Sequence, residues 1–295
     1  MATNVGAGLA SVRDRMEGEA RMTLLLDRAA GDDVRRSGLY DGDIHVGLPR
    51  LKSRVKRVLS GLGFDIVRSA NNRGGVDDFV PFEPTMRAAR AAGLSVGDYI
   101  DEVMSGTPGA TQSTIDELRA CGVFAGRPSS VLEIGPGSGR YLERTLQECS
   151  PNRYEIYETA APWANYLVET FGVVAQPTVG SSLAPTPDRS IDLVLAHKVF
   201  NTVTFLCSSR YFLEMARVTR SGGRIVFDVL TETCLDPATV RAWATHDGEG
   251  HDSYPAALPR QTCVDLFADL GCTVEASFLA PLGFATTEVL VFRKD

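Results

Sequence analysis

The chain has 295 residues, which is enough for one large α/β domain with a smaller accessory region. Apolar residues make up 44% and charged residues 23%, so the composition excludes a chain that is disordered throughout. The net charge of -7 disfavours a broad nucleic-acid-binding surface, because neutralising phosphates requires an excess of Lys and Arg. A small-molecule or glycan partner fits this charge better.

No stretch resembles an apolar signal-peptide core, and no run reaches the roughly 18 apolar residues of a membrane span. The six cysteines are scattered, without a C-x-x-C pair or the spacing of zinc ligands. We therefore expect a cytoplasmic protein whose thiols are reduced and mostly buried.

Residues 1–125 are predicted to form a helical and irregular accessory region. Candidate helices lie at 10–30 and 51–62, and the second is amphipathic, with Leu and Val at helical spacing. Five Lys or Arg within residues 50–57 form the basic cluster. This helix would permit peripheral contact with an anionic membrane surface, and the alternative is a solvated basic face packed on the main domain. Three further short helices are expected at residues 86–92, 96–104 and 111–121.

From residue 126 to 295 strands and helices alternate, which predicts βαβ units and a mainly parallel sheet. The expected strands are residues 131–134, 154–157, 173–174, 191–196, 223–228, 272–278 and 287–292. The expected helices are residues 140–149, 161–171, 208–218 and 261–270. A short loop joins the last two strands, so the chain is expected to end on an antiparallel pair.

The first strand ends in a glycine loop, Gly135-Pro136-Gly137-Ser138-Gly139, that leads into a helix. Glycine has no Cβ, so the backbone can approach a ligand closely, and the helix N-terminus offers free N–H groups. The G-x-G-x-G spacing differs from the G-x-G-x-x-G of dinucleotide folds and favours S-adenosylmethionine. The alternative is a tight strand-to-helix turn that binds no ligand.

The second strand ends with an acid, Glu158, which follows Gly139 by 19 positions. A carboxylate there can accept hydrogen bonds from both ribose hydroxyls, and dinucleotide folds place theirs about 20 residues on. We predict Glu158 as the ribose ligand, with a solvated strand-end glutamate as the alternative. Glu155 is a weaker candidate because it should point to the other side of the strand.

Together these motifs resemble class I S-adenosylmethionine-dependent methyltransferases over residues 129–295. The matching pieces are residues 131–139, Glu158, residues 191–194 and residues 221–226. The resemblance implies S-adenosylmethionine as the cofactor of a domain spanning residues 126–295. It also implies a Rossmann-like, seven-stranded, mostly parallel sheet of order 3-2-1-4-5-7-6, with the last strand antiparallel and an N-terminal helical region in front.

The resemblance further implies which residues bind the cofactor. In that family the glycines of the loop line the methionyl part, so we place all five glycine-loop residues there. Glu133 lies near the cofactor, and a buried acid needs such a partner. Many relatives use an acid before the fourth strand to meet the adenine amino group, whereas here Ser181 or the backbone would make that contact. Ala196, at the end of the fourth strand, completes the set.

Methyl transfer to an oxygen requires alignment of the acceptor and removal of its proton. The fourth strand ends in Ala196-His197-Lys198, at the carboxyl edge where open α/β sheets bind ligands. His197 is the candidate general base, because an ordinary histidine pKa of about 6.5 suits that proton transfer. The alternative is a histidine that packs under the cofactor or bonds a loop. Lys198 and Asn201 either line the same mouth or serve as surface and helix-capping residues.

The segment from Thr231 to Pro255 is unusually polar and is expected to overhang the cofactor mouth as a flexible lid. It contains two histidines and three acids between His246 and Asp252. Their spacing matches no specific metal motif, so a divalent-metal site is the alternative and no metal ligand is assigned.

The acceptor is indicated by resemblance alone. Residues 51–68 look like leader segments of bacterial glycan and glycolipid methyltransferases, and residues 197–232 are similar to bacterial sugar O-methyltransferases. We expect O-methylation of a sugar hydroxyl in a glycan, glycolipid or glycosylated metabolite. The alternatives are a small-molecule N- or C-methyltransferase and a non-catalytic scaffold that retains the fold. A nicotinamide-dependent oxidoreductase is disfavoured by the glycine spacing.

Overall fold

The structure, a computed structural model, describes residues 80–245, 256–283 and 285–295. The chain divides into two units, Met1–Ser69 and Ala70–Asp295, and all described residues belong to the second. The helices predicted at 10–30 and 51–62, with the basic cluster, lie outside the described residues. So does the part of the predicted lid at 246–255.

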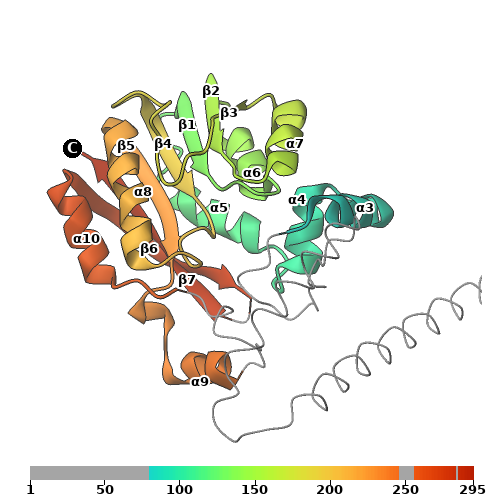
Figure 1. Ribbon diagram of the computed structural model, residues 1–295. Coiled ribbons are helices and arrows are strands. Elements are labelled where there is room, and N and C mark those ends of the chain that lie inside the picture. Colours follow the sequence, from blue (N-terminus) through green and yellow to red (C-terminus); the bar gives the residue numbers. More distant parts are fainter. Residues whose placement is uncertain (1–79, 246–255, 284) are drawn as a thin grey trace, which may run out of the picture. The chain divides into compact units, whose positions relative to one another are not determined.

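The second unit contains one seven-stranded sheet (Figure 1). Its strands are β1 (Ser130–Ile134), β2 (Arg153–Tyr157), β3 (Val174–Ala175), β4 (Ile191–Ala196), β5 (Thr219–Val229), β6 (Cys272–Leu282) and β7 (Ala285–Lys294). Their order is 3-2-1-4-5-7-6, with β7 antiparallel to both neighbours and every other neighbouring pair parallel. The predicted Rossmann-like topology is therefore confirmed.

Helices cover both faces of the sheet (Figure 1). One face carries α5 (Ala110–Ala120), α6 (Arg140–Cys149) and α7 (Ala161–Phe171), and the other carries α8 (Phe205–Val218) and α10 (Arg260–Asp269). Strand side chains alternate between the faces, so Val131 packs into the first layer and Leu132 into the second. Burial on both faces explains why the central strands are almost continuously apolar.

The N-terminal helices of this unit differ from expectation at one point. The structure has α3 (Phe82–Ala92), α4 (Val96–Tyr99) and the π-helix η1 (Ile100–Met104), where the sequence predicted one continuous helix over 96–104. π-Helical turns are rare in proteins, and many of those that occur lie at functional sites. The buried Asp101 of η1 accepts hydrogen bonds from the backbone N and the hydroxyl of Thr111, at 2.8 and 2.6 Å, which ties η1 to α5.

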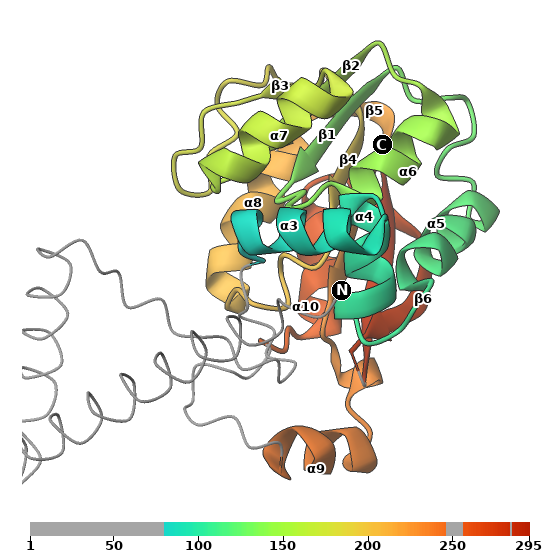
Figure 2. The ribbon, with the colours of Figure 1, turned by 90° about the vertical axis from the view of Figure 1, so that its right-hand side faces the viewer.

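These helices pack beside the start of α6 and α7 (Figure 2). The Trp163 indole donates a hydrogen bond of 2.8 Å to the Val80 carbonyl, and Arg144 of α6 pairs with Asp98 at 2.6 Å. Residues 80–101 therefore lie close to the first turns of α6 and α7, at the carboxyl edge of the sheet. The boundary at residues 125 and 126 stays a prediction.

Helix α9 (Pro237–Thr245) falls in the segment that the sequence predicted as a flexible lid. Asp236 accepts hydrogen bonds from the backbone N–H of Ala238 and Thr239, at 2.7 and 2.9 Å, as a helix-capping residue does. Asp followed by Pro at the first helical position was the available signal for a helix start.

Two global expectations concern membranes and thiols. None of the helices in the described ranges is long and apolar enough to cross a bilayer. All six cysteines are free thiols, four of them are buried, and Cys207 is exposed.

Candidate cofactor and active site

The three glycines of the glycine loop are required for different reasons. All have positive φ, 61° at Gly135, 54° at Gly137 and 81° at Gly139. A Cβ on Gly135 would lie 2.8 Å from the Val199 side chain, and one on Gly139 would collide with Leu167. A Cβ on Gly137 would meet no atom within 4 Å. Gly135 and Gly139 therefore allow close packing, whereas Gly137 borders open space, as a ligand cradle would.

This difference gives a paired prediction. Gly139→Ala should lower the melting temperature strongly, because the added methyl group meets packed side chains. Gly137→Ala should cost about 1 kcal/mol of stability for its left-handed backbone and should weaken binding of S-adenosylhomocysteine much more. Thermal unfolding and calorimetric titration would measure the two effects. Equal losses of stability in both variants would contradict the cradle at Gly137.

Glu158 lies directly beside the glycine loop because β1 and β2 run in parallel, with Ile134 opposite Tyr157. One carboxylate oxygen accepts a hydrogen bond from Gly137 N at 2.8 Å, and the other accepts one from Ala160 N at 2.8 Å. Each oxygen keeps a second lone pair. Glu158 thus shapes the loop and can still accept hydrogen bonds from ribose hydroxyls. Glu155, in contrast, is buried and bonded to Gln176 and Thr186.

Glu133 is almost completely buried, with 1% of its surface exposed. This burial raises its pKa to about 7, although the Tyr154 hydroxyl donates a hydrogen bond of 2.6 Å to it. The negative charge of Glu158 raises the pKa further. A carboxyl that titrates near neutrality, in the strand that leads into the glycine loop, suits a place beside a cationic ligand group.

The other predicted cofactor residues occupy the same edge. Pro136 and Ser138 are buried, and the Pro136 carbonyl accepts a hydrogen bond from Gly139 N that closes the turn. Ala196 is fully buried at the end of β4. Their contacts with a cofactor stay predictions.

His197 follows Ala196 and has 1% of its side chain exposed. Its ring stacks on Tyr141, with centroids 4.2 Å apart and planes 19° from parallel. Burial lowers its pKa to about 4, although the negative charge of Asp228 acts to raise it. The ring is therefore neutral at pH 7. Its Nδ1 atom is 4.0 Å from Asp228 Oδ1. Its Nε2 atom has no hydrogen-bond partner among the described residues.

The sequence did not point to Asp228, although it is the one acid among the apolar residues 225–229 that end β5. It accepts a hydrogen bond of 2.6 Å from Lys198 N, and Lys198 Nζ lies 3.1 Å from its second oxygen. Burial raises the pKa of this carboxyl, but the positive charge of Lys198 and the interaction with His197 outweigh burial and lower it. Asp228 is therefore ionised beside a neutral imidazole.

Asn201 differs from the surface or capping role that the sequence left open. The residue is fully buried, and neither its amide oxygen nor its amide nitrogen has a partner in the part of the chain that the structure describes. Its backbone carbonyl accepts a hydrogen bond of 2.7 Å from Ala256 N, which fixes the loop after β4 against the segment before α10. A buried amide without partners is costly, so Asn201 is a candidate ligand-binding group.

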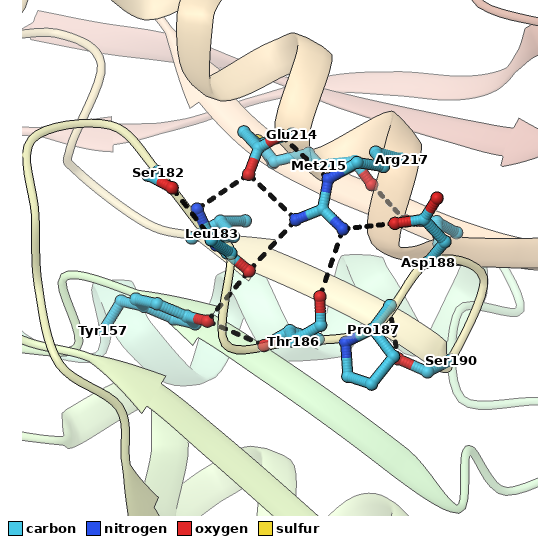
Figure 3. Close-up of polar contacts among 12 residues, drawn as sticks. Tyr157, Ser182, Leu183, Thr186, Pro187, Asp188, Ser190, Glu214, Met215 and Arg217 are labelled. Carbon is cyan, nitrogen blue, oxygen red and sulfur yellow. Dashed lines mark hydrogen bonds and ion pairs between the residues drawn. The ribbon is translucent and has the colours of Figure 1, made fainter.

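Ser181 lies in the loop before β4, which is held firmly against α8 (Figure 3). Arg217 donates hydrogen bonds to the carbonyls of Thr186 and Leu183, at 3.1 and 3.0 Å, and Glu214 accepts one from Leu183 N at 2.8 Å. Ser181 lines a groove of about 590 Å³ between this loop and α8. No glycine-loop residue lines that groove, so the adenine contact of Ser181 stays a prediction.

Another buried acid at the same edge, Glu288 of β7, accepts hydrogen bonds on both of its carboxylate oxygens. It accepts hydrogen bonds from the hydroxyls of Thr231 and Thr233 and from the Arg260 guanidinium, at 2.6, 2.9 and 2.7 Å. Burial raises its pKa, but these hydrogen bonds outweigh burial and lower it. Glu288 therefore holds β7 to the end of β5 through these hydrogen bonds.

Within the described ranges, no group of three or more His, Cys, Asp or Glu side chains could hold a metal ion. The histidines and acids of the predicted lid, at 246–255, lie outside them.

Comparison with known protein families decides the activity. Residues 132–227 match a family model described as "Methyltransferase domain", and this range runs from β1 into β5 and includes the glycine loop, Glu158 and His197. The chain is an S-adenosylmethionine-dependent methyltransferase. The open cradle at Gly137, held by the carboxylate of Glu158, fits that cofactor.

Several solved methyltransferase structures are similar to this chain. Magnesium protoporphyrin IX methyltransferase from Synechocystis PCC 6803 has 14% sequence identity and a TM-score of 0.50, over 83% of this chain and 100% of that chain. The 1,6-didemethyltoxoflavin-N1-methyltransferase of Burkholderia thailandensis has 19% identity and a TM-score of 0.48, over 72% and 88%. The N-methyltransferase NodS of Bradyrhizobium japonicum WM9 has 16% identity and a TM-score of 0.47, over 62% and 86%. No curated protein matches the chain.

Proposed function

We propose that this methyltransferase transfers the methyl group to a hydroxyl of a sugar, in a glycan, a glycolipid or a glycosylated metabolite, with His197 as the general base. The observation that carries the proposal is the His197 ring, which is buried, neutral at pH 7, and unpartnered at Nε2 among the described residues. A hydroxyl acceptor needs such a group, whereas an amine with a free lone pair does not.

The cofactor supplies a methyl group already activated on a sulfonium, which leaves the protein to align the acceptor and receive its proton. In the proposed reaction the acceptor oxygen bonds to the methyl carbon, the bond from that carbon to sulfur breaks, and the hydroxyl proton passes to His197 Nε2. The ionised Asp228 lies 4.0 Å from Nδ1 and would stabilise the imidazolium that forms. Tyr141 holds the ring in place by stacking.

A sugar is favoured among hydroxyl acceptors because the edge of the sheet offers both donors and acceptors. The Asn201 amide has an unpartnered oxygen and an unpartnered nitrogen, and neighbouring sugar hydroxyls can bond both at once. A purely apolar acceptor would leave these groups buried and unsatisfied. The net charge of -7 also fits a glycan better than a nucleic acid.

The proposal is tested by incubating the full chain with cofactor carrying an isotopically labelled methyl group and a panel of free sugars, glycosides, nucleotide sugars and small amines. We expect label in a methyl ether, identified by the chemical shift of the labelled carbon. The Gly137→Ala variant should show no transfer and serves as the control for cofactor dependence. Label found only in amines or on carbon would overturn the proposal.

A further inference from the structure

We propose that Arg140 binds the α-carboxylate of the methionine moiety of S-adenosylmethionine. The inference rests on the cofactor and is independent of the hydroxyl acceptor proposed above. Arg140 lies outside the glycine loop and was not among the predicted cofactor residues. The supporting observation is that its guanidinium group is not fully hydrogen-bonded among the described residues.

The Arg140 side chain is 18% exposed, and its Nη1 atom is buried without a hydrogen-bond partner in the described ranges. Asp101 Oδ1 lies 3.9 Å from Nη1, too far for a hydrogen bond. That oxygen already accepts two hydrogen bonds from Thr111. The guanidinium carbon lies 5.1 Å from the Tyr141 ring centroid. Asp101 therefore compensates the charge of Arg140 only in part.

The position of Arg140 at the start of α6 makes its unpartnered Nη1 atom more unfavourable. Arg140 is the first residue of α6, directly after Gly139, where the helix dipole already presents positive charge. The positive charge of Arg140 also helps to lower the pKa of the buried His197. The positive end of the α6 dipole and the charge of Arg140 thus lie close together at a buried N–H group. A bound anion would offset the unfavourable charge of both.

The cofactor carries one carboxylate, at the end of its methionine moiety. Glu158, at the end of β2, is the acid suited to the ribose, and His197, at the end of β4, lies on the other side of β1. We place Arg140 on the His197 side, because it directly precedes Tyr141, which stacks on the His197 ring, and because its charge acts on that ring. A cofactor that extends from Glu158 across the glycine loop would therefore bring its methionine end toward Arg140.

Calorimetry on the full chain can separate this role from a structural ion pair with Asp101. The two ligands are S-adenosylhomocysteine and the analogue in which hydrogen replaces its carboxylate. We expect the native protein to bind the first at least about tenfold more tightly, because hydrogen bonds to charged groups contribute strongly. Arg140→Met should bind both with equal, weak affinity. Arg140→Lys should keep part of the preference, since lysine retains the charge but not the planar fork.

Arg144→Met is the matched control, because Arg144 lies one turn further along α6 and pairs with Asp98 of the same N-terminal segment at 2.6 Å. It should retain the full preference for the carboxylate. The proposal is overturned if Arg140→Met keeps the native ratio of affinities, if it weakens both ligands by the same factor, or if the native protein shows no preference. Thermal unfolding of each variant without ligand reports the structural contribution separately, and failure of the sugar panel would leave this result untouched.

Discussion

Replacing His197 with alanine is expected to lower kcat for a hydroxyl acceptor by about 100-fold to 10,000-fold, the usual contribution of a general base. The expected cause is loss of the proton acceptor, because the unpartnered Nε2 disappears with the ring. Steady-state kinetics with the best acceptor from the sugar panel would measure the effect. Tyr141→Phe is the matched control, since it keeps the ring that stacks on His197 and should leave kcat nearly unchanged.

The same residue sets the expected pH profile. Proton transfer requires neutral His197, and burial lowers its pKa to about 4, so activity should persist as the pH falls from 7 to 5. Activity should then decline as the pH passes through about 4. An ordinary histidine would impose that decline near pH 6.5. Full activity of His197→Ala would instead favour transfer to nitrogen or carbon.

The sequence was sufficient to predict most of the fold because local signals mark the ends of its elements. The bounds of α6, α7 and β4 are those predicted: the glycine loop precedes α6, and Gly172 in a left-handed conformation ends α7. The order of the strands required the resemblance to a known family, since the alternation of strands and helices predicts a parallel sheet without fixing which strand lies at its edge.

The candidate site was predicted only in part, because its residues meet through tertiary packing. His197 and Glu158 could be placed from their positions at strand ends. Asp228 reaches His197 only because β4 and β5 pair, and the position of Arg140 near Asp101 depends on the packing of η1 against α5 and α6. Burial is equally invisible in the sequence, and burial sets the pKa of His197 and the unpartnered state of the Asn201 amide.

Burial also makes the stability of the protein depend on pH through Glu133. Its pKa is raised from 4.5 to about 7 in the folded protein, so between these values the folded state binds a proton that the unfolded state has released. The contribution of Glu133 to the free energy of unfolding is therefore fully present below pH 4.5 and is lost as the pH rises toward 7. At about 1.4 kcal/mol per pH unit, the loss amounts to roughly 3 kcal/mol.

Glu133→Gln should remove this loss, because the neutral amide retains an oxygen that can accept the Tyr154 hydrogen bond. Urea unfolding without cofactor should therefore show the variant more stable than the native protein by about 3 kcal/mol at pH 8, with a difference below about 1 kcal/mol at pH 5. A constant difference at the two pH values would show that Glu133 does not titrate in this range.

Glu288→Gln provides the control of opposite sign. The pKa of Glu288 is lowered in the folded protein, so its ionised form adds stability above its ordinary pKa and that contribution is lost as the pH falls. This variant should be less stable than the native protein at pH 8. The stabilisation in Glu133→Gln should come with weaker binding of S-adenosylhomocysteine, because the neutral amide no longer attracts the cofactor's ammonium group. A stabilised variant that binds the cofactor as tightly as the native protein would remove Glu133 from the cofactor site.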